Sequence, residues 1–194
     1  MMTSRSEYRL LHRQDNADFR LTETGCRIVL ISEDRRRQVT EKYEAVQREI
    51  RRLEKTFTAP TPALCTLLEK HGTAAPHSGV SLAALLRRPQ LTLGDLAPFD
   101  PDAPALSDEI REQVEISIKY EGYIEKQLQQ VAEFRKMEQR KLPEDMDYAA
   151  VSGLRLEARQ KLADIRPVNL GQASRISGVS PADIAALMIY IERH

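Results

Sequence analysis

Arginine side chains recur through the first twenty residues, where Arg5, Arg9, Arg13 and Arg20 follow one another at intervals of four to seven residues. A guanidinium group presents a planar set of N–H donors that matches the oxygens of a phosphate. The spacing therefore predicts an anion- or phosphate-binding segment. A solvated charged face is the alternative interpretation.

Residues that could perform catalysis do not assemble into a motif. The eight glycines never form GxGxxG or a P-loop, so no nucleotide cradle is encoded. The two cysteines lack CxxC spacing, and the four histidines lie in unrelated contexts without HExxH. We therefore predict no catalytic, cofactor-binding or metal-binding residue in this chain, and no such role for either cysteine, Cys26 or Cys65.

A helix-turn-helix cadence occurs near the C-terminus, in residues 172–184, with Gly178 at the predicted turn. A recognition helix must present polar side chains to base edges. Residues 184–191 are nearly all apolar, so DNA reading is the weaker interpretation. A packed helical hairpin is one alternative. The other is a partner-protein surface that contains Ile189 and Tyr190.

The longest helical pattern available to position these residues runs from residue 107 to 141, about 50 Å at ~1.5 Å per residue. Its apolar stripe widens onto a neighbouring face, which predicts burial on more than one side. Glu121 falls inside this arc, and a buried carboxylate needs a partner, either the free N–H groups of another helix or an arginine. The adjacent Gly122 is predicted to let a neighbouring backbone approach closely.

Cap residues and apolar spacing predict the other helices. Residues 39–53 carry a coiled-coil-like seam after the cap residue Ser32. Basic side chains along that helix are interpreted as intrahelical ion pairs on a solvent face, with RNA contact as the alternative. Further helices are predicted to begin at Thr61, Ser81, Thr92, Ser152, Asn169 and Ser180. The predicted fold is all-α, an irregular helical bundle around one long central helix that ends in a helix-turn-helix-like hairpin.

Composition favours a soluble helical protein. The 194 residues include 29 basic and 29 acidic side chains, so the net charge is zero and no strongly basic surface is indicated globally. No apolar run reaches the length of a membrane span, and the start lacks the apolar core of a signal peptide. We expect a cytoplasmic protein with no membrane partner.

Four ordered motifs resemble the C-terminal third of the glucose-inhibited division protein A family, the flavin-dependent tRNA uridine 5-carboxymethylaminomethyl modification enzymes. The motifs are TSRSEYRL with the following RxDNAD, then IKYEGYI, VSGL and GQASRISGV, at residues 3–18, 118–124, 151–154 and 171–179. The resemblance extends over the whole chain and is loosest between residues 35 and 105.

This resemblance implies that the chain is a fragment of a longer enzyme. In the family, a preceding domain binds FAD and carries an NADH-linked insertion, so FAD and NADH are implied for the parent protein and no cofactor for this chain. Residues 1–31 would then be the end of the flavin-binding domain. Residues 32–105 would be a satellite of short helices, and residues 107–194 the C-terminal helical bundle.

Two partners are also implied by the resemblance, tRNA and a tRNA-modification GTPase. The expected tRNA-binding residues are Arg5, Arg9, Arg13, Arg20, Lys119 and Arg175. The chain is expected to recruit the GTPase and to help hold tRNA, without turnover of its own. The alternative is a helical module whose principal role is to bind nucleic acid.

Overall fold

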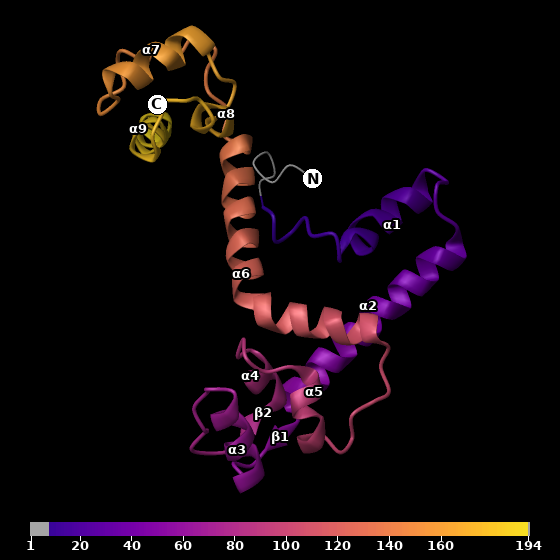
Figure 1. Ribbon diagram of the computed structural model, residues 1–194. Coiled ribbons are helices and arrows are strands. Elements are labelled where there is room, and N and C mark those ends of the chain that lie inside the picture. Colours follow the sequence, from indigo (N-terminus) through magenta and orange to yellow (C-terminus); the bar gives the residue numbers. More distant parts are fainter. Residues whose placement is uncertain (1–7, 194) are drawn as a thin grey trace. The chain divides into compact units, whose positions relative to one another are not determined.

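The computed structural model describes residues 8–193 (Figure 1). Among these residues the regular secondary structure is helical, apart from one short antiparallel ladder of two strands, so the predicted all-α class is confirmed. The chain divides into two compact units, Met1–Glu125 and Lys126–His194. The division falls inside the long helix α6 (Asp108–Gln139), whereas the sequence placed a boundary just before that helix.

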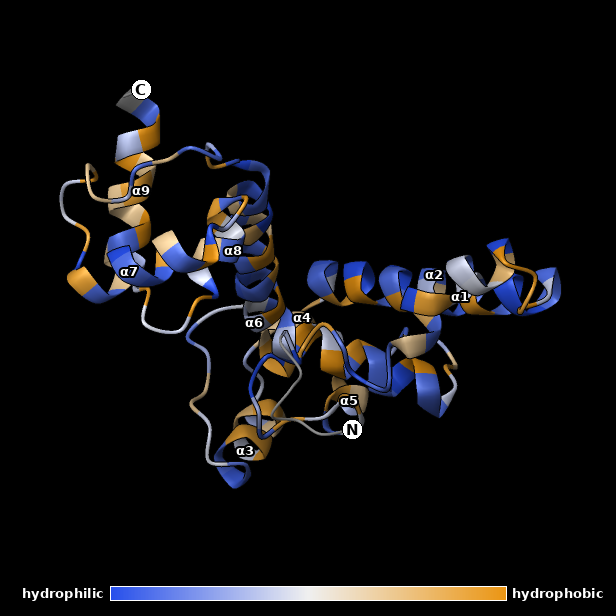
Figure 2. Ribbon diagram, turned by 90° about the horizontal axis from the view of Figure 1, so that it is seen from above, coloured by the Kyte–Doolittle hydropathy of each residue, from blue (hydrophilic) through white to orange (hydrophobic). Residues whose placement is uncertain are grey.

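The first unit begins with two helices, α1 (Ala17–Arg27) and α2 (Glu33–Lys55). The short strands β1 (Phe57–Thr58) and β2 (Val80–Ser81) pair antiparallel and enclose α3 (Pro62–Lys70) in the chain. The chain then forms α4 (Leu82–Leu86), α5 (Leu93–Leu96) and the 3-10 helix η2 (Ala97–Phe99) before it enters α6. Figure 2 shows hydrophilic and hydrophobic residues alternating along α2, as expected for a helix with one buried face.

The starts of α2, α3, α4 and α5 are where the sequence placed them. The hydroxyl groups of Ser32, Thr61 and Ser81 each accept a hydrogen bond from a backbone N–H in the first turn. Thr92 forms a complete capping box with Asp95. Each cap satisfies an N–H group that has no partner within the helix, which is why these short helices can form at all.

Leu64 and Leu68 of α3 and Leu82, Leu85 and Leu86 of α4 lie in the core of the first unit. They pack against the α2 seam at Val46 and Leu53 and against Val114 and Ile118 of α6, and all of these are buried. Burying a side chain of this size contributes about 1.5–3 kcal/mol. The predicted seam of α2 is therefore confirmed, and its partners are short helices and α6.

A buried ion cluster fastens the segment after η2 to α2. Arg52 donates to the Glu49 carboxylate at 2.9 and 2.8 Å and to the Asp100 carboxylate at 2.8 and 2.5 Å. The hydrogen bonds to Glu49 and then Asp100 raise the pKa of Arg52 above its usual range. Both carboxylates are buried, so losing Arg52 would leave uncompensated charge inside the unit.

The second unit contains the end of α6 with α7 (Leu156–Ile165), α8 (Leu170–Ser174) and α9 (Pro181–Arg193). Its core is formed by Leu142, Met146, Tyr148, Val151, Leu154, Leu162, Leu170, Ala173, Ile184 and Leu187. A single bridge pairs Lys141 with Asn169. Residues 170–193 form the predicted hairpin, with Gly178 in the turn at φ +95°.

Two expectations about helix positions were wrong. Helix α7 begins at Leu156, four residues later than the predicted start at Ser152, because Gly153 has φ +90° and cannot lie in a helical turn. No helix was predicted in the charged segment before Ser32, but α1 runs from Ala17 to Arg27. The sequence of α1 is mostly polar and its buried face consists of little more than Thr22, so few apolar side chains mark the helix in the sequence.

Helix α6 is also less buried than its apolar arc predicts. Among the described residues, only Gln113, Val114 and Ile118 of this helix are buried, while Tyr123 and Leu128 are exposed. Glu121 is 41% exposed, so its predicted burial was wrong, although an arginine partner, one of the two expected, is present in Arg87. Gly122 was predicted to permit a close backbone approach, but no described neighbour beyond its own stretch of helix would lie within 4 Å of a β-carbon there.

Candidate nucleic-acid interface

The N-terminal arginines hold their own segment together. Arg5 lies outside the described residues, and Arg9 is exposed. Arg13 donates to Asp15 at 3.0 and 3.1 Å and to the Leu10 carbonyl at 2.6 Å. Asp15 in turn accepts from Gln113 of α6 at 3.1 Å, so this segment is connected to the core of the first unit.

Arg20 has a similar local role. It donates to Asn16 Oδ1 at 2.8 Å and to the Arg13 carbonyl at 3.4 Å. The guanidinium groups of Arg13 and Arg20 therefore both have partners inside the chain. The phosphate contact expected of Arg9, Arg13 and Arg20 stays a prediction.

Lys119 and Arg175 also have partners, each within its own unit. Lys119 lies 3.4 Å from Glu115, one turn earlier on α6. Arg175 pairs with Glu138 at 2.5 Å, and its guanidinium carbon lies 4.6 Å from the centre of the Phe134 ring. An arginine stacked on an aromatic face gains a cation–π contact and keeps other N–H groups available to a ligand.

An ion cluster joins α1 to α2 beside the N-terminal segment. Lys42 contacts the Asp18 carboxylate and donates to Glu109 at 2.7 Å. Tyr43 donates its hydroxyl to Asp18 at 3.3 Å. Burial and then the Asp18 charge raise the pKa of Tyr43 to about 12. The tyrosine therefore stays protonated and acts as a hydrogen-bond donor at neutral pH.

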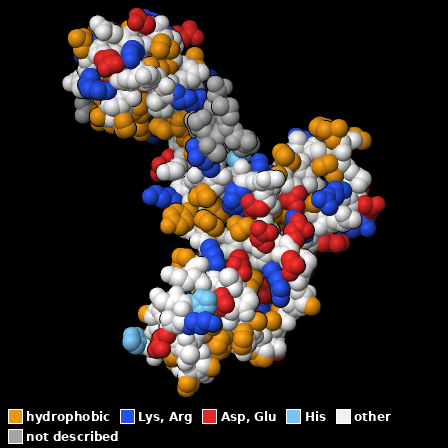
Figure 3. Space-filling model, in the orientation of Figure 1, with side chains coloured by type: hydrophobic (Ala, Val, Ile, Leu, Met, Phe, Trp, Pro, Cys, Tyr) orange, Lys and Arg blue, Asp and Glu red, His pale blue; other side chains and the backbone are white. Residues whose placement is uncertain are grey.

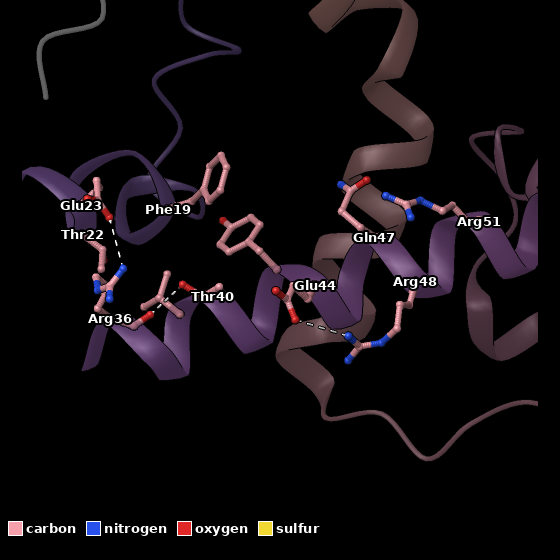
Figure 4. A pocket seen from close by; sticks show the side chains of 11 residues that line it. Phe19, Thr22, Glu23, Arg36, Thr40, Glu44, Gln47, Arg48 and Arg51 are labelled. Carbon is pink, nitrogen blue, oxygen red and sulfur yellow. Dashed lines mark hydrogen bonds and ion pairs between the residues drawn. The ribbon is translucent and has the colours of Figure 1, made fainter. Parts of the chain in front are cut away.

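A groove of about 630 Å³ lies between α1 and α2 (Figure 4). Its lining includes Val39 and an aromatic pair, Phe19 and Tyr43, whose ring centres are 4.3 Å apart with a tilt of 31°. This size is within the range of small-ligand sites in proteins. The sequence does not indicate this groove, because Phe19 lies in the N-terminal segment for which no helix was predicted, and Tyr43 belongs to the predicted seam at residues 39–53.

Charged side chains line the rim of the groove. Arg36 lies 3.9 Å from Glu23, and Arg48 lies 3.6 Å from Glu44. Arg51, which also lines the groove, has no ion pair or hydrogen-bond partner through its side chain among residues 8–193. Figure 4 shows Arg51 and Gln47 extending on one side of α2 and Arg48 on the other.

Hydrophobic side chains also gather at the turn that joins α1 to α2 (Figure 3). Ile28, Val29 and Leu30 are exposed there. In the second unit, Ile189 is 52% exposed on α9, whereas Tyr190 is half-buried and packs against the core of that unit. The two residues predicted to form a partner surface therefore differ, since only Ile189 is largely open to solvent.

Asp183 organises the turn of the C-terminal hairpin. It is buried and accepts from the Arg155 backbone at 3.1 Å and from the Arg155 side chain at 2.7 Å. It also accepts from the Ser180 backbone and hydroxyl at 2.8 and 2.6 Å. Arg155 donates further to the Gly178 carbonyl at 2.8 Å. The start of α9 is thereby held against the start of α7.

The described residues do not form the arrangements that usually bind metal ions and dinucleotides. Within the described part of the chain, no group of three or more His, Cys, Asp or Glu side chains could hold a metal ion. The two strands have two residues each, and the turns that contain glycine do not follow a buried parallel strand. A dinucleotide such as FAD or NADH normally requires that strand-turn-helix arrangement, so the described residues do not fit one.

The described helices form an all-α module, with a candidate ligand groove in one unit and a capped helical hairpin in the other. Two family models match the chain. One, described as the tRNA modifying enzyme MnmG/GidA C-terminal helical domain, matches residues 33–128. The other, described as the C-terminal helical bundle of the same enzyme, matches residues 130–194. The chain belongs to the MnmG/GidA family, as the resemblance of its motifs predicted.

Individual relatives agree with the family models. The tRNA uridine 5-carboxymethylaminomethyl modification enzymes MnmG of Caldicellulosiruptor saccharolyticus and Geobacillus kaustophilus are 53% and 50% identical over the whole chain. The chain spans 31% of the length of each. The solved structure of Aquifex aeolicus GidA is similar to 96% of this chain with a TM-score of 0.64 and 34% identity, over 29% of that chain. Among residues 8–193, none of the helices combines the length and the apolar character that crossing a membrane requires.

Proposed function

We propose that this chain is the recruiting and RNA-holding part of a tRNA-modifying enzyme. In this proposal the chain binds the partner tRNA-modification GTPase, helps to hold tRNA in the cytoplasm and has no turnover of its own. The flavin and the NADH chemistry belong to the remainder of the longer protein, because the residues described here do not fit a dinucleotide. The match to the C-terminal helical parts of MnmG/GidA enzymes supports this proposal.

The observation that supports a GTPase-binding surface on α9 is the exposed position of Ile189. The buried face of α9 is already filled by Ile184 and Leu187, and Ile189 lies outside it at 52% exposure. An apolar side chain in that position is suited to contact a protein partner. Tyr190, which packs against the core of the unit, would fix the orientation of that surface.

Capture of the GTPase by this chain tests the partner surface. Ile189→Asp should abolish most of the capture, because it places a charge in an apolar contact. Ile165→Asp is the matched control, since Ile165 is similarly exposed on α7 of the same unit. Equal capture by wild type and both variants would refute the surface.

A second candidate function is nucleic-acid binding as the principal role. The observation that favours it is the cationic end of α2, where neither Arg51 nor Lys55 has a side-chain partner among residues 8–193. Salt dependence separates the two functions. Phosphate contacts make the affinity for tRNA fall steeply with salt concentration, whereas an apolar contact with the GTPase should change little.

A further inference from the structure

We propose that the groove between α1 and α2 binds an unpaired nucleotide of tRNA, with its base against Phe19 and a neighbouring phosphate on Arg51. This inference deepens the proposed function and rests on its tRNA-binding part. Neither Phe19 nor Arg51 is among the tRNA-binding residues that the family resemblance implied.

Aromatic surface in the groove provides the place for a base. Phe19 lines the groove and is 59% exposed, and its ring packs against that of Tyr43 on one side. Unpaired bases stack on exposed aromatic side chains in single-stranded RNA recognition. A base on Phe19 would continue the stack that Phe19 and Tyr43 begin.

Charge at the rim distinguishes a nucleotide from an apolar peptide. The acidic side chains that line the groove, Glu23 and Glu44, each have an arginine opposite, Arg36 and Arg48. Arg51 therefore adds positive charge that no acidic side chain of the described residues balances. The positive charge of Arg51 can pair with a phosphate, whereas an apolar peptide offers it no group of opposite charge.

Helix α2 leads from the proposed base site at Phe19 and Tyr43 to the proposed phosphate site at Arg51. Gln47 and Arg51 extend on the same side of α2 (Figure 4), one helical turn apart, and Lys55 follows one turn later. Gln47 carries both a donor and an acceptor that can meet a base edge. The groove thus presents an aromatic ring, a polar amide and the Arg51 cation along one helix, and Lys55 lies one turn beyond its lining.

Fluorescence anisotropy tests this assignment with the whole 194-residue chain and a labelled, unmodified tRNA as the probe. Phe19→Ala should weaken binding by about 5- to 150-fold, the range that corresponds to the loss of one stacked base. Phe19→Tyr should bind as wild type does, because it retains the ring. Phe57→Ala is the matched control, since Phe57 is an exposed phenylalanine elsewhere in the same unit.

Substitution of the cation adds an independent readout. Arg51→Gln should lower the slope of log affinity against log salt by about one unit, as expected for loss of one phosphate contact. Arg37→Gln, an exposed arginine of the same helix that pairs with Asp34, should leave that slope nearly unchanged. Circular dichroism of each variant confirms that the helices are intact.

Several outcomes would overturn the assignment. Unchanged tRNA binding by Phe19→Ala, or an equal loss in Phe57→Ala, would remove the groove from the RNA contact while leaving tRNA binding by the chain intact. Loss of GTPase capture in Phe19→Ala with normal tRNA binding would show that a protein occupies the groove. Absence of tRNA binding by the wild-type chain would instead refute the tRNA-binding part of the proposed function, and the groove assignment with it.

Discussion

Arg87 donates two hydrogen bonds to a single carboxylate oxygen of Glu121, at 3.2 Å from Nε and 2.7 Å from Nη2. The pair joins the end of α4 to the middle of α6 within the first unit. Both side chains are partly exposed, so water competes with the contact. Glu121 is therefore a surface link between two helices and not the buried charge that its position in the apolar arc predicted.

Glu121→Ala should accordingly lower the free energy of unfolding by no more than about 1 kcal/mol, the usual value for an exposed ion pair. Urea denaturation followed by circular dichroism measures the change. Combining it with Arg87→Ala in a double-mutant cycle isolates the coupling between the two side chains. A loss of several kcal/mol in the single variant would indicate that Glu121 is buried after all.

Local signals in the sequence predicted the helices better than they predicted burial. Side-chain caps at Ser32, Thr61 and Ser81 act within one turn, so their effect can be seen in a few adjacent residues. Apolar periodicity shows which face of α6 could be buried, but it does not show whether another element covers that face. Tyr123 and Leu128 lie on such a face and are exposed among the described residues.

The candidate groove could not be predicted for a related reason. Phe19 and Tyr43 are far apart in the chain, and they meet only because α1 folds back onto α2. The helix α1 is polar on average and Thr22 is its one buried residue, so few apolar side chains mark its inner face. Polar links between Asp18 and Lys42 hold it in place, and such long-range pairs leave no pattern in a single sequence.

Val29 occupies a backbone conformation that favours glycine. Its φ is +63°, and it lies at the end of α1 where the Leu30 N–H bonds to the Gly25 carbonyl and the Val29 N–H bonds to the Cys26 carbonyl. This is the Schellman arrangement, in which glycine usually takes the left-handed position. A β-branched residue there is strained by about 1–2 kcal/mol.

Val29→Gly should therefore stabilise the chain by about 1 kcal/mol, even though glycine increases the entropy of the unfolded state. Because Val29 is 89% exposed, the substitution removes little packing. Thermal denaturation measures the gain. The matched control is Leu30→Gly at the next position, which is also exposed but does not have a positive φ, so glycine there should destabilise. A lower melting temperature for Val29→Gly would contradict the strained conformation.

Gly171 provides the close approach that the sequence assigned to Gly122. A β-carbon on Gly171 would lie 2.5 Å from Glu138 Cγ and 3.2 Å from the Glu138 backbone, because α8 packs directly on the end of α6. Gly171→Ala should therefore destabilise the second unit by about 1–3 kcal/mol, as overpacking does. Hydrogen exchange of the α8 amides would show the effect locally.

Gly122→Ala is the opposite case, on α6 itself. Open space surrounds that position among the described residues, and alanine is favoured over glycine inside a helix by about 0.5–1 kcal/mol. We expect a small increase in the midpoint of urea denaturation. A decrease would mean that a neighbouring backbone does approach Gly122 in solution.

Asp183 makes the stability of the second unit depend on acid pH. Hydrogen bonds from Arg155, and also from Ser180, hold the pKa of this carboxyl well below its usual range, although burial opposes the shift. A carboxyl whose pKa is lower in the folded state stabilises the fold above its unfolded value of about 3.9. That stabilisation is lost as the pH falls below this value towards the folded pKa.

Melting of the wild-type chain should therefore shift to lower temperature as the pH falls from about 5 to about 2, and the shift should be smaller in Asp183→Asn. At neutral pH the variant should already be less stable, because Arg155 loses its charged acceptor. Asp164→Asn, an exposed aspartate of α7, serves as the control and should follow the wild-type profile. Identical pH profiles for wild type and Asp183→Asn would show that the Arg155–Asp183 link does not stabilise the hairpin.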